Sequence, residues 1–454
     1  MSLTCEDRPT LLTGLEEASL YHDAGEHGFF SLLLCDPRQE PLIEGKHSYP
    51  KVQKSYRLSE MPRVIEALDQ DRDTWISQAE FIRPNRRVIY LLRLNLCFAD
   101  LDTYKIPWKS YQPGTLANIL RGFCQNEDLP EPSLILFSGR GLQVKWLFTR
   151  PLPRAALPRW NAVQKHLVER LESFGADQSA RDASRLLRLV DTINTRSGER
   201  VRVLWVNDSQ GEIIHYGFDQ LAERLLPVDR DTLRKAREGK KTKEKQHRLK
   251  LLQGSKTGNL RAFSGRQLSW DRLEDLRTLA KLRGWMDGIP HGYRSKYIHW
   301  CLNFLLLSGA VHSSQLFHEA QALVREVCPD FPKEVRSVLS TLYRKAQAYE
   351  AGEHIEFEGK EYPPLYTPRN STLITLFDAT DAEVKQLKTI ITKEEAAERH
   401  RERNRKQMDR ATYLRTAEQR RTEARLLRAK GLSWKEVGEN MGISATAAQL
   451  LASR

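Results

Sequence analysis

The chain contains the stretch Val88-Ile89-Tyr90-Leu91-Leu92-Arg93-Leu94-Asn95-Leu96-Cys97-Phe98-Ala99-Asp100-Leu101-Asp102, an apolar run that ends in two carboxylates. Side chains alternate between faces along an extended strand, so Asp100 and Asp102 are predicted to share one face where a buried strand ends. Paired carboxylates on a rigid strand end are typical of a divalent-metal site, because hard cations such as Mg²⁺ take oxygen ligands. A simple turn is the alternative, since Asp is common in loops after strands.

The overall composition favours a multidomain protein with a polyanionic partner. The chain has 454 residues, of which 40% are hydrophobic, and this length suggests roughly two to four domains. Lys and Arg total 72 against 59 for Asp and Glu, which gives a formal net charge of +13. A basic balance of this size makes nucleic acid the first candidate partner, although a soluble protein can also be basic without binding one.

Cysteine usage and hydropathy bear on the cellular compartment. The 6 cysteines are widely spaced, with no Cys-x-x-Cys pair that would suggest a zinc or redox site, so they are expected to be ordinary buried thiols. The first residues lack a basic segment followed by an apolar core, and no apolar run approaches the length of a membrane span. We therefore expect a cytoplasmic protein with no membrane partner.

Two further apolar runs, 133–138 and 142–148, predict a β-hairpin. They are joined by Gly139-Arg140-Gly141, and a three-residue connection with two glycines favours a tight turn. Alternation along the second strand places Gln143 and Lys145 on one face. Such a hairpin can bind a triphosphate through its backbone N–H groups and the lysine; a purely structural hairpin is the alternative.

The segment 182–194 is rich in arginine and ends in a Thr-x-Asn pair. Arg185 and Arg188 are three residues apart, so on a helical turn they would face the same way, as a clamp for phosphate or carboxylate requires. The alternative is surface pairing of these arginines with Asp182 and Asp191, which would contribute little to stability.

Changes in composition divide the chain into four regions. Residues 1–228 predict an α+β core, with strands at 29–35, 75–81, 88–102 and 201–206 and helices at 115–125 and 158–174. Residues 229–262 are highly charged and predict a linker. Residues 263–352 show helical apolar spacing and predict an all-α domain of about four helices. Residues 369–454 follow a proline-rich break, and their densely charged stretch from Thr389 to Lys430 predicts a long exposed helix.

The end of the chain has the spacing of a helix-turn-helix. Ser433 and Ser444 are well placed as helix N-caps, and Met441-Gly442-Ile443 is a suitable turn between two short helices. In such a unit the second helix enters the major groove of DNA. The candidate DNA-binding residues are therefore Ser444, Ala445, Thr446 and Gln449. A helical hairpin used for protein contacts is the alternative.

Taken in order, these motifs resemble the archaeo-eukaryotic type of primase-polymerase and, more narrowly, the RepB-like primases of plasmid and mobile-element replication proteins. The resemblance covers about residues 20–225, and residues 268–350 resemble the helical C-terminal domain that follows such primases. It implies that Asp100 and Asp102 form the first carboxylate motif and that Asp182 is the third. Asp182 is preferred over Asp191 because its distance from the Thr-x-Asn pair fits the family pattern.

The resemblance also implies a two-metal nucleotidyl transfer, with Mg²⁺ or Mn²⁺ held by Asp100, Asp102 and Asp182. The residues implied in nucleotide binding are Ser138, Arg140, Gln143, Lys145, Arg185, Arg188 and Asn194. Two positions depart from the family pattern. Gln143 stands where the family has His, and an amide donates hydrogen bonds but carries no charge. Asp191 stands where the family usually has Gly.

We therefore expect a replication protein of a plasmid or integrated mobile element, acting as a primase on single-stranded DNA with nucleoside triphosphates and binding double-stranded origin DNA through its tail. A separate helicase is expected, because the sequence has no Gly-x-x-x-x-Gly-Lys-Ser/Thr loop. The alternative is a catalytically inactive origin-binding or regulatory DNA-binding protein. A nicking relaxase is disfavoured, since none of the 12 histidines forms a His-x-His pair.

Overall fold

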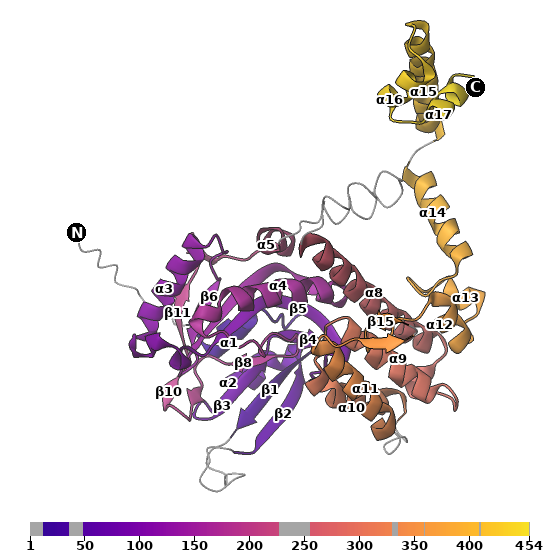
Figure 1. Cartoon of the computed structure of the whole chain (residues 1–454). Helices are drawn as coiled ribbons and strands as arrows, with labels where there is room; N and C mark the ends of the chain where they lie inside the picture. Colours follow the sequence, from indigo (N-terminus) through magenta and orange to yellow (C-terminus); the bar gives the residue numbers. More distant parts are fainter. Residues whose placement is uncertain are drawn as a thin grey trace, which may run out of the picture. The chain divides into compact units, whose positions relative to one another are not determined.

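The structure is a computed structural model that describes residues 12–35, 49–226, 255–328, 335–357, 359–407 and 410–453. The chain forms two compact units, Met1–Pro368 and Arg369–Arg454 (Figure 1). Most of the predicted linker, residues 229–254, lies outside the described residues. Across the described ranges, we find no helix with the length and apolar character that crossing a membrane requires.

Within its described residues, the first unit is built on an antiparallel sheet of nine strands. Its strand order is β11-β6-β7-β5-β4-β1-β3-β8, with β2 paired to β1. The strands are β1 Phe29–Cys35, β2 Lys51–Arg57, β3 Asp73–Ser77, β4 Ala79–Phe81, β5 Leu91–Leu101, β6 Leu134–Phe137, β7 Leu142–Pro153, β8 Leu186–Arg188 and β11 Arg202–Val206. Three small ribbons add β9 Ile193–Asn194 with β10 Glu199–Arg200, β12 Asp208–Ser209 with β13 Glu212–Ile213, and β14 Ile355–Phe357 with β15 Lys360–Tyr362.

Strand β5 is the centre of this sheet, as the long apolar run predicted. It pairs with β4 at its beginning and with β7 over most of its length, and its residues from Leu94 to Ala99 are buried. Strand β4 pairs only with the first residues of β5. On that side, the next backbone groups of β5 form hydrogen bonds with side chains of the helix α4, Leu157–Arg170. Trp160 donates to the Leu96 carbonyl at 2.9 Å, and Gln164 bonds both the N–H and the carbonyl of Phe98. Backbone groups that lack a neighbouring strand are thereby satisfied.

The remaining helices of the core are α1 Gly14–Ser19, α2 Met61–Glu66, α3 Pro113–Asn126 and α5 Phe218–Leu225. The predicted strand at 75–81 is divided into β3 and β4 at Gln78. The predicted hairpin at 133–148 is confirmed as β6 and β7, which pair in antiparallel register.

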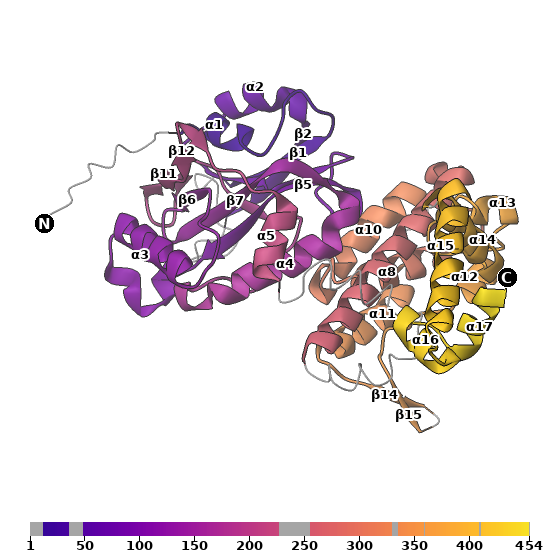
Figure 2. The ribbon, with the colours of Figure 1, turned by 90° about the horizontal axis from the view of Figure 1, so that it is seen from above.

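Four helices follow, as predicted for the all-α region: α8 Ser255–Leu282, α9 Arg294–Leu307, α10 Leu316–Val327 and α11 Val335–Glu350 (Figure 2). They belong to the same compact unit as the sheet. The buried carboxylate of Glu319 in α10 accepts hydrogen bonds from the Val88 and Ile89 N–H groups, at 3.1 and 3.2 Å. Tyr90 donates its hydroxyl to the Ala322 carbonyl at 2.8 Å. The helical region thus packs directly against the start of β5.

The second unit is helical throughout its described residues. It contains α12 Asn370–Leu376, α13 Asp381–Val384, α14 Lys393–Gln407, α15 Arg410–Ala429, α16 Trp434–Met441 and α17 Ala445–Ser453. The last three helices enclose a small core of Ala424, Val437 and Ala448. Ser433 begins α16 with a capping box that includes Glu436, as its sequence position predicted.

One local prediction is wrong. The segment around Arg185 and Arg188 is not a helical turn, because Leu186–Arg188 forms β8 at the edge of the sheet and pairs with β3. Burial of Leu187 and the hydrogen bonds to β3 outweigh the local helical spacing.

Candidate active site

The two carboxylates predicted from the sequence lie where β5 ends. Asp100 is the last residue but one of the strand and is directly opposite Gln143 on β7. Asp102 is already outside the strand, where the chain enters a 3₁₀ turn, Thr103–Lys105. The prediction that both acids continue one strand face therefore fails at Asp102, whose carboxylate forms an ion pair with Lys105.

A third carboxylate, Asp177, lies beside them and was missed by the sequence reasoning. The segment 175–177 pairs antiparallel with the end of β5, so that Asp177 donates its N–H to the Asp100 carbonyl at 2.9 Å. Asp102 donates its N–H to the Gly175 carbonyl, also at 2.9 Å. Gly175 has a φ of +77°, and a Cβ there would lie 2.9 Å from the Asp102 carbonyl oxygen. A glycine two residues before an acid was the available sequence signal for this close approach.

The electrostatics of Asp100 reflect this gathering of acids. Burial and the nearby Asp102 carboxylate raise the pKa of Asp100 to about 6, Asp177 raises it further, and Arg185 and Arg188 act in the opposite direction. A carboxylate that is buried beside other acids is stabilised in its charged form by a bound cation. Carboxylate oxygens are hard ligands, the type that Mg²⁺ and Mn²⁺ prefer, so these three side chains suit either ion chemically.

The described residues contain no three histidine, cysteine or acidic side chains that already converge on one point as metal ligands. One reason is that the Asp102 carboxylate is paired with Lys105 and is therefore held away from the other acids. Lys105 is largely exposed, so opening this pair is inexpensive and would free the Asp102 carboxylate to join Asp100.

Asp182, the predicted third carboxylate, is occupied within its own turn. Its Oδ1 accepts from the Ser184 N–H at 3.1 Å and from the Ser184 hydroxyl at 2.6 Å, and its Oδ2 pairs with Arg185 at 3.0 Å. Asp177 is bonded within its own turn in the same way, because its Oδ1 accepts from the Ser179 N–H at 2.9 Å and from the Ser179 hydroxyl at 2.7 Å. What distinguishes Asp177 is its backbone pairing with Asp100. The alternative acid, Asp191, has a φ of +66° and caps α1 by accepting from the Gly14 N–H at 3.1 Å. The arrangement therefore favours Asp177 over both.

The tip of the β6–β7 hairpin packs against the carboxylates. A Cβ on Gly141 would lie 2.2 Å from the Leu101 carbonyl oxygen, so only glycine permits this contact. The Ser138 hydroxyl bonds the Gly141 backbone, and Asn194 donates to the Ser138 carbonyl at 2.9 Å. Ser138 and Asn194 thus hold the tip in place. Arg140, at the tip, stacks on Tyr104 with its guanidinium carbon 4.0 Å from the ring centre.

Two predicted nucleotide contacts on β7 have different surroundings. Lys145 is fully buried, with its ammonium group paired to Glu17 of α1 and 3.3 Å from the Tyr21 hydroxyl. The prediction that Lys145 meets a triphosphate is therefore wrong, because a buried ammonium requires this neutralising partner. Gln143 stays beside Asp100, and its buried Oε1 has no hydrogen-bond partner among the described residues.

The two arginines reach the site from adjoining segments. Arg185 precedes β8 and donates to Asp182. Arg188 lies on β8, pairs with Asp73 of β3 and stacks on Trp75 at 4.5 Å. Arg185 lies just before β8 and Arg188 lies within it, and both lower the pKa of Asp100. The two predicted arginines therefore act on the carboxylates, but they lie on and beside a β-strand and not on a helical turn.

The candidate DNA-binding residues lie around the start of α17. Ser444 precedes the helix, and its hydroxyl accepts from the Ala447 N–H at 3.2 Å. Ser444, Thr446 and Gln449 are exposed, and Ala445 is half-buried.

Comparison with known proteins adds a relative but no family model, since none matches the chain. The chain is 27% identical over 323 residues to a protein named "Replication protein" from Clostridium perfringens, covering 71% of this chain and 69% of that protein. Among solved structures, the primase domain of the cyanophage S-2L primase-polymerase is 20% identical, with a TM-score of 0.33 over 47% of this chain and 96% of its own. Primase RepB′ is 14% identical, with a TM-score of 0.28 over 74% and 99%.

The match to the replication protein of Clostridium perfringens confirms the resemblance of this chain to replication proteins that its motifs predicted.

Proposed function

We propose that the chain is a DNA primase that acts in the replication of a plasmid or integrated mobile element. The observation that carries this proposal is the antiparallel pairing of residues 175–177 with the end of β5, which gathers Asp100, Asp102 and Asp177. Three carboxylates around one backbone junction, with arginines close by, suit nucleotidyl transfer to a hydroxyl group.

In this proposal Asp100, Asp102 and Asp177 hold Mg²⁺ or Mn²⁺. The bound metal would polarise the reacting phosphate and neutralise charge on the leaving pyrophosphate. Arg140 and Arg185 offer charge-assisted hydrogen bonds to the triphosphate, and the Gln143 amide offers an uncharged one. Arg188 supplies positive potential next to Asp100. Ser138 and Asn194 act by holding the hairpin tip that carries Arg140.

Primer synthesis on single-stranded DNA with labelled nucleotides and Mg²⁺ or Mn²⁺ tests the proposal. We expect metal-dependent products from the natural chain and none from the double variant Asp100→Ala/Asp102→Ala. Circular dichroism and single-stranded DNA binding of the variant would establish that it is folded. A folded, DNA-binding natural chain that makes no product with any metal or nucleotide mixture contradicts the proposal.

That negative outcome would favour the second candidate, an inactive origin-binding or regulatory protein. The ion pair between Asp102 and Lys105 and the uncharged Gln143 are compatible with it. The gathered carboxylates favour the primase. Burial and the neighbouring Asp102 raise the pKa of Asp100, and a bound cation would offset both effects.

We also propose that α15, α16 and α17 form a helix-turn-helix that binds double-stranded origin DNA, while a separate helicase unwinds it. The capped start of α17 and the exposed Ser444, Thr446 and Gln449 support this proposal, as do the exposed Arg420, Arg425 and Arg428 of α15. Thr446→Ala/Gln449→Ala is expected to lower affinity for duplexes selected on the natural chain by about tenfold. Equal loss on unselected duplexes would contradict base recognition by α17.

A further inference from the structure

The strands β2, β1, β3 and β8 present two chemically different faces. In antiparallel pairs, directly opposite residues share a face. Cys35 lies opposite Lys51, Leu33 lies opposite both Gln53 and Trp75, and Trp75 lies opposite Arg188. Lys51, Gln53, Trp75 and Arg188 therefore project from one face of the sheet. Phe29 and Arg57, an opposite pair at the far end of β1 and β2, project from the same side. We call this set the basic face.

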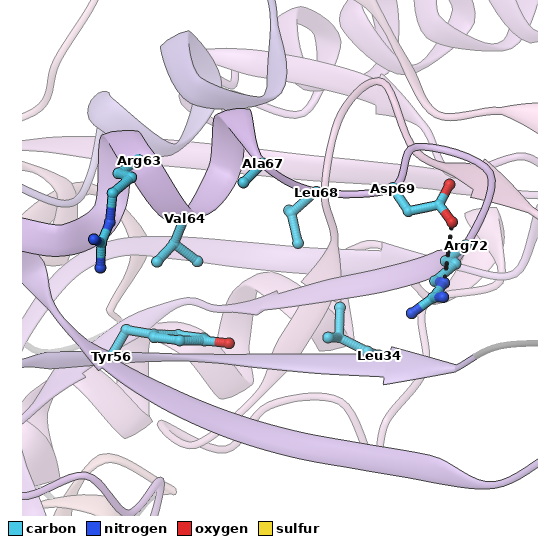
Figure 3. A pocket seen from close by; sticks show the side chains of 8 residues that line it. All are labelled: Leu34, Tyr56, Arg63, Val64, Ala67, Leu68, Asp69 and Arg72. Atoms are coloured by element: carbon cyan, nitrogen blue, oxygen red, sulfur yellow. Dashed lines mark ion pairs between the residues drawn. The ribbon is translucent and has the colours of Figure 1, made fainter.

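The other side of the same strands is apolar and covered by α2. There, Leu34 and Tyr56 face Val64, Ala67 and Leu68 across a cavity of about 430 Å³ (Figure 3). The two arginines at its rim already have acidic partners: Arg72 pairs with Asp69 at 3.1 Å, and Arg63 lies 3.6 Å from Glu60. On the basic face Arg188 is likewise paired, with Asp73, which lies opposite Cys35 on that face. The difference between the two faces is Lys51, and it makes the basic face the candidate surface.

The basic face combines aromatic rings with cations. Trp75 is half-buried, with the Lys51 ammonium 5.0 Å and the Arg188 guanidinium 4.5 Å from its ring centre. At the other end, the Arg57 guanidinium lies 5.8 Å from the Phe29 ring centre. Lys51 is exposed and has no acidic partner in the described part of the chain. Alternating rings and cations on a sheet are the means by which single-stranded nucleic acids are bound without sequence readout.

The basic face also adjoins the segment that carries Arg185 and Arg188. Arg188 lies on the face itself, and its positive charge lowers the pKa of the Asp100 carboxyl. Arg86 bridges the same region, because it donates to Gln53 on β2 at 3.2 Å and to the carbonyl of Ser184, which precedes Arg185. Arg86 thus joins β2 to the segment that carries Arg185 and Arg188.

We propose that the basic face binds single-stranded DNA, with a base stacked on Trp75 and with phosphates at Lys51, Arg57 and Arg86. The inference rests on the proposed primase function, because the bound strand would be the template. The binding itself requires no catalysis and can be measured separately. On binding, a base takes one side of the Trp75 ring and the flexible Lys51 ammonium moves from the ring to a phosphate.

Two lysines of β2 provide a matched test. Lys51 and Lys54 are both exposed, but they are three residues apart on a strand and so project from opposite faces. We would measure binding of a fluorescein-labelled oligothymidylate to the full chain by anisotropy, without metal or nucleotide. Lys51→Glu should weaken binding about tenfold and reduce the salt slope by about 1, whereas Lys54→Glu should change both far less. Any binding by the C-terminal unit is common to both variants.

The stacking role is tested at Trp75. Trp75→Ala should weaken oligothymidylate binding about five- to tenfold, and Trp75→Phe, which keeps a ring, about twofold or less. Equal effects of Lys51→Glu and Lys54→Glu, or unchanged binding by a folded Trp75→Ala chain, would overturn the proposal. If primer synthesis is absent while these binding differences are found, the proposed function fails and the binding surface stands.

Discussion

Lys145 illustrates, at the scale of one residue, how the core constrains the site. Its ammonium group is fully buried, and burial lowers its pKa, while the Glu17 carboxylate acts to keep it charged. A buried ion pair of this kind adds little net stability, but losing one partner leaves an uncompensated charge in the core. Through this pair, α1 is fixed to the strand that also carries Gln143.

We therefore predict that Lys145→Met lowers the free energy of unfolding by about 3 kcal/mol, because Glu17 is left buried without a counter-charge. The double variant Glu17→Gln/Lys145→Met should recover a large part of that loss. Urea unfolding of the natural chain, the single variant and the double variant measures both values. A double variant no more stable than the single one would show that packing, and not charge, causes the loss.

The residue scale also shows the limit of sequence reasoning about the site. Asp100 and Asp102 are visible in the sequence because a strand pattern leads directly to them. Asp177 is not, because its place beside Asp100 depends on a loop that pairs with β5 only in the folded chain. Lys145 was misplaced for a related reason: alternation assigns a face but does not reveal that α1 covers it.

Among the elements, the β6–β7 hairpin shows how a close backbone approach positions a charged group. Gly141 permits the tip to rest on Leu101, which brings Arg140 next to Tyr104 and Asp102. The tight turn was predictable from its glycines. Its contact with the end of β5 was not, because it joins residues about forty positions apart in the chain.

We predict that Gly141→Ala reduces primer synthesis by about tenfold or more, since the added Cβ pushes the tip and Arg140 away from the carboxylates. Gly122 provides the control. It lies within α3 with no atom within 4 Å of an added Cβ, so Gly122→Ala should raise stability slightly through its better helix propensity. Primer-synthesis rates and unfolding curves of both variants are the measurements. Full activity in Gly141→Ala would show that the tip position does not matter.

A second element, α10, makes the packing of the helices on the sheet sensitive to pH. Burial raises the pKa of Glu319 to about 7. The two hydrogen bonds from the Val88 and Ile89 N–H groups lower this pKa, but their effect is smaller than that of burial. The folded state then holds the proton more tightly than the unfolded state. Stability from this group is therefore greatest below the unfolded value of 4.5 and falls as pH rises toward 7.

The predicted loss between pH 5 and pH 8 is up to about 3 kcal/mol from this residue. Glu319→Gln, which cannot ionise, should show a smaller difference in unfolding free energy between the two pH values, even if its stability at pH 5 is lower. Urea unfolding at both pH values provides the comparison. An identical pH dependence in the two proteins would show that Glu319 is not the responsible group.

At the scale of the whole molecule, the chain consists of two compact units, Met1–Pro368 and Arg369–Arg454. The α+β core, the four helices after it and the capped C-terminal helices were all predictable, because periodicity and capping residues are local signals. The joining of core and helical region into one unit was not. It depends on Glu319 and Tyr90, whose partners lie more than two hundred residues away.

The most direct test of the whole account compares two acids that lie five residues apart in the chain. Primer synthesis should fall by about two orders of magnitude or more in Asp177→Asn, because this change removes a charged ligand beside Asp100. Asp182→Asn changes an acid that is already neutralised by its ion pair with Arg185, so this variant should retain substantial activity. Loss of activity in a folded Asp182→Asn chain with Asp177→Asn unaffected would contradict the account and restore Asp182 as the third carboxylate.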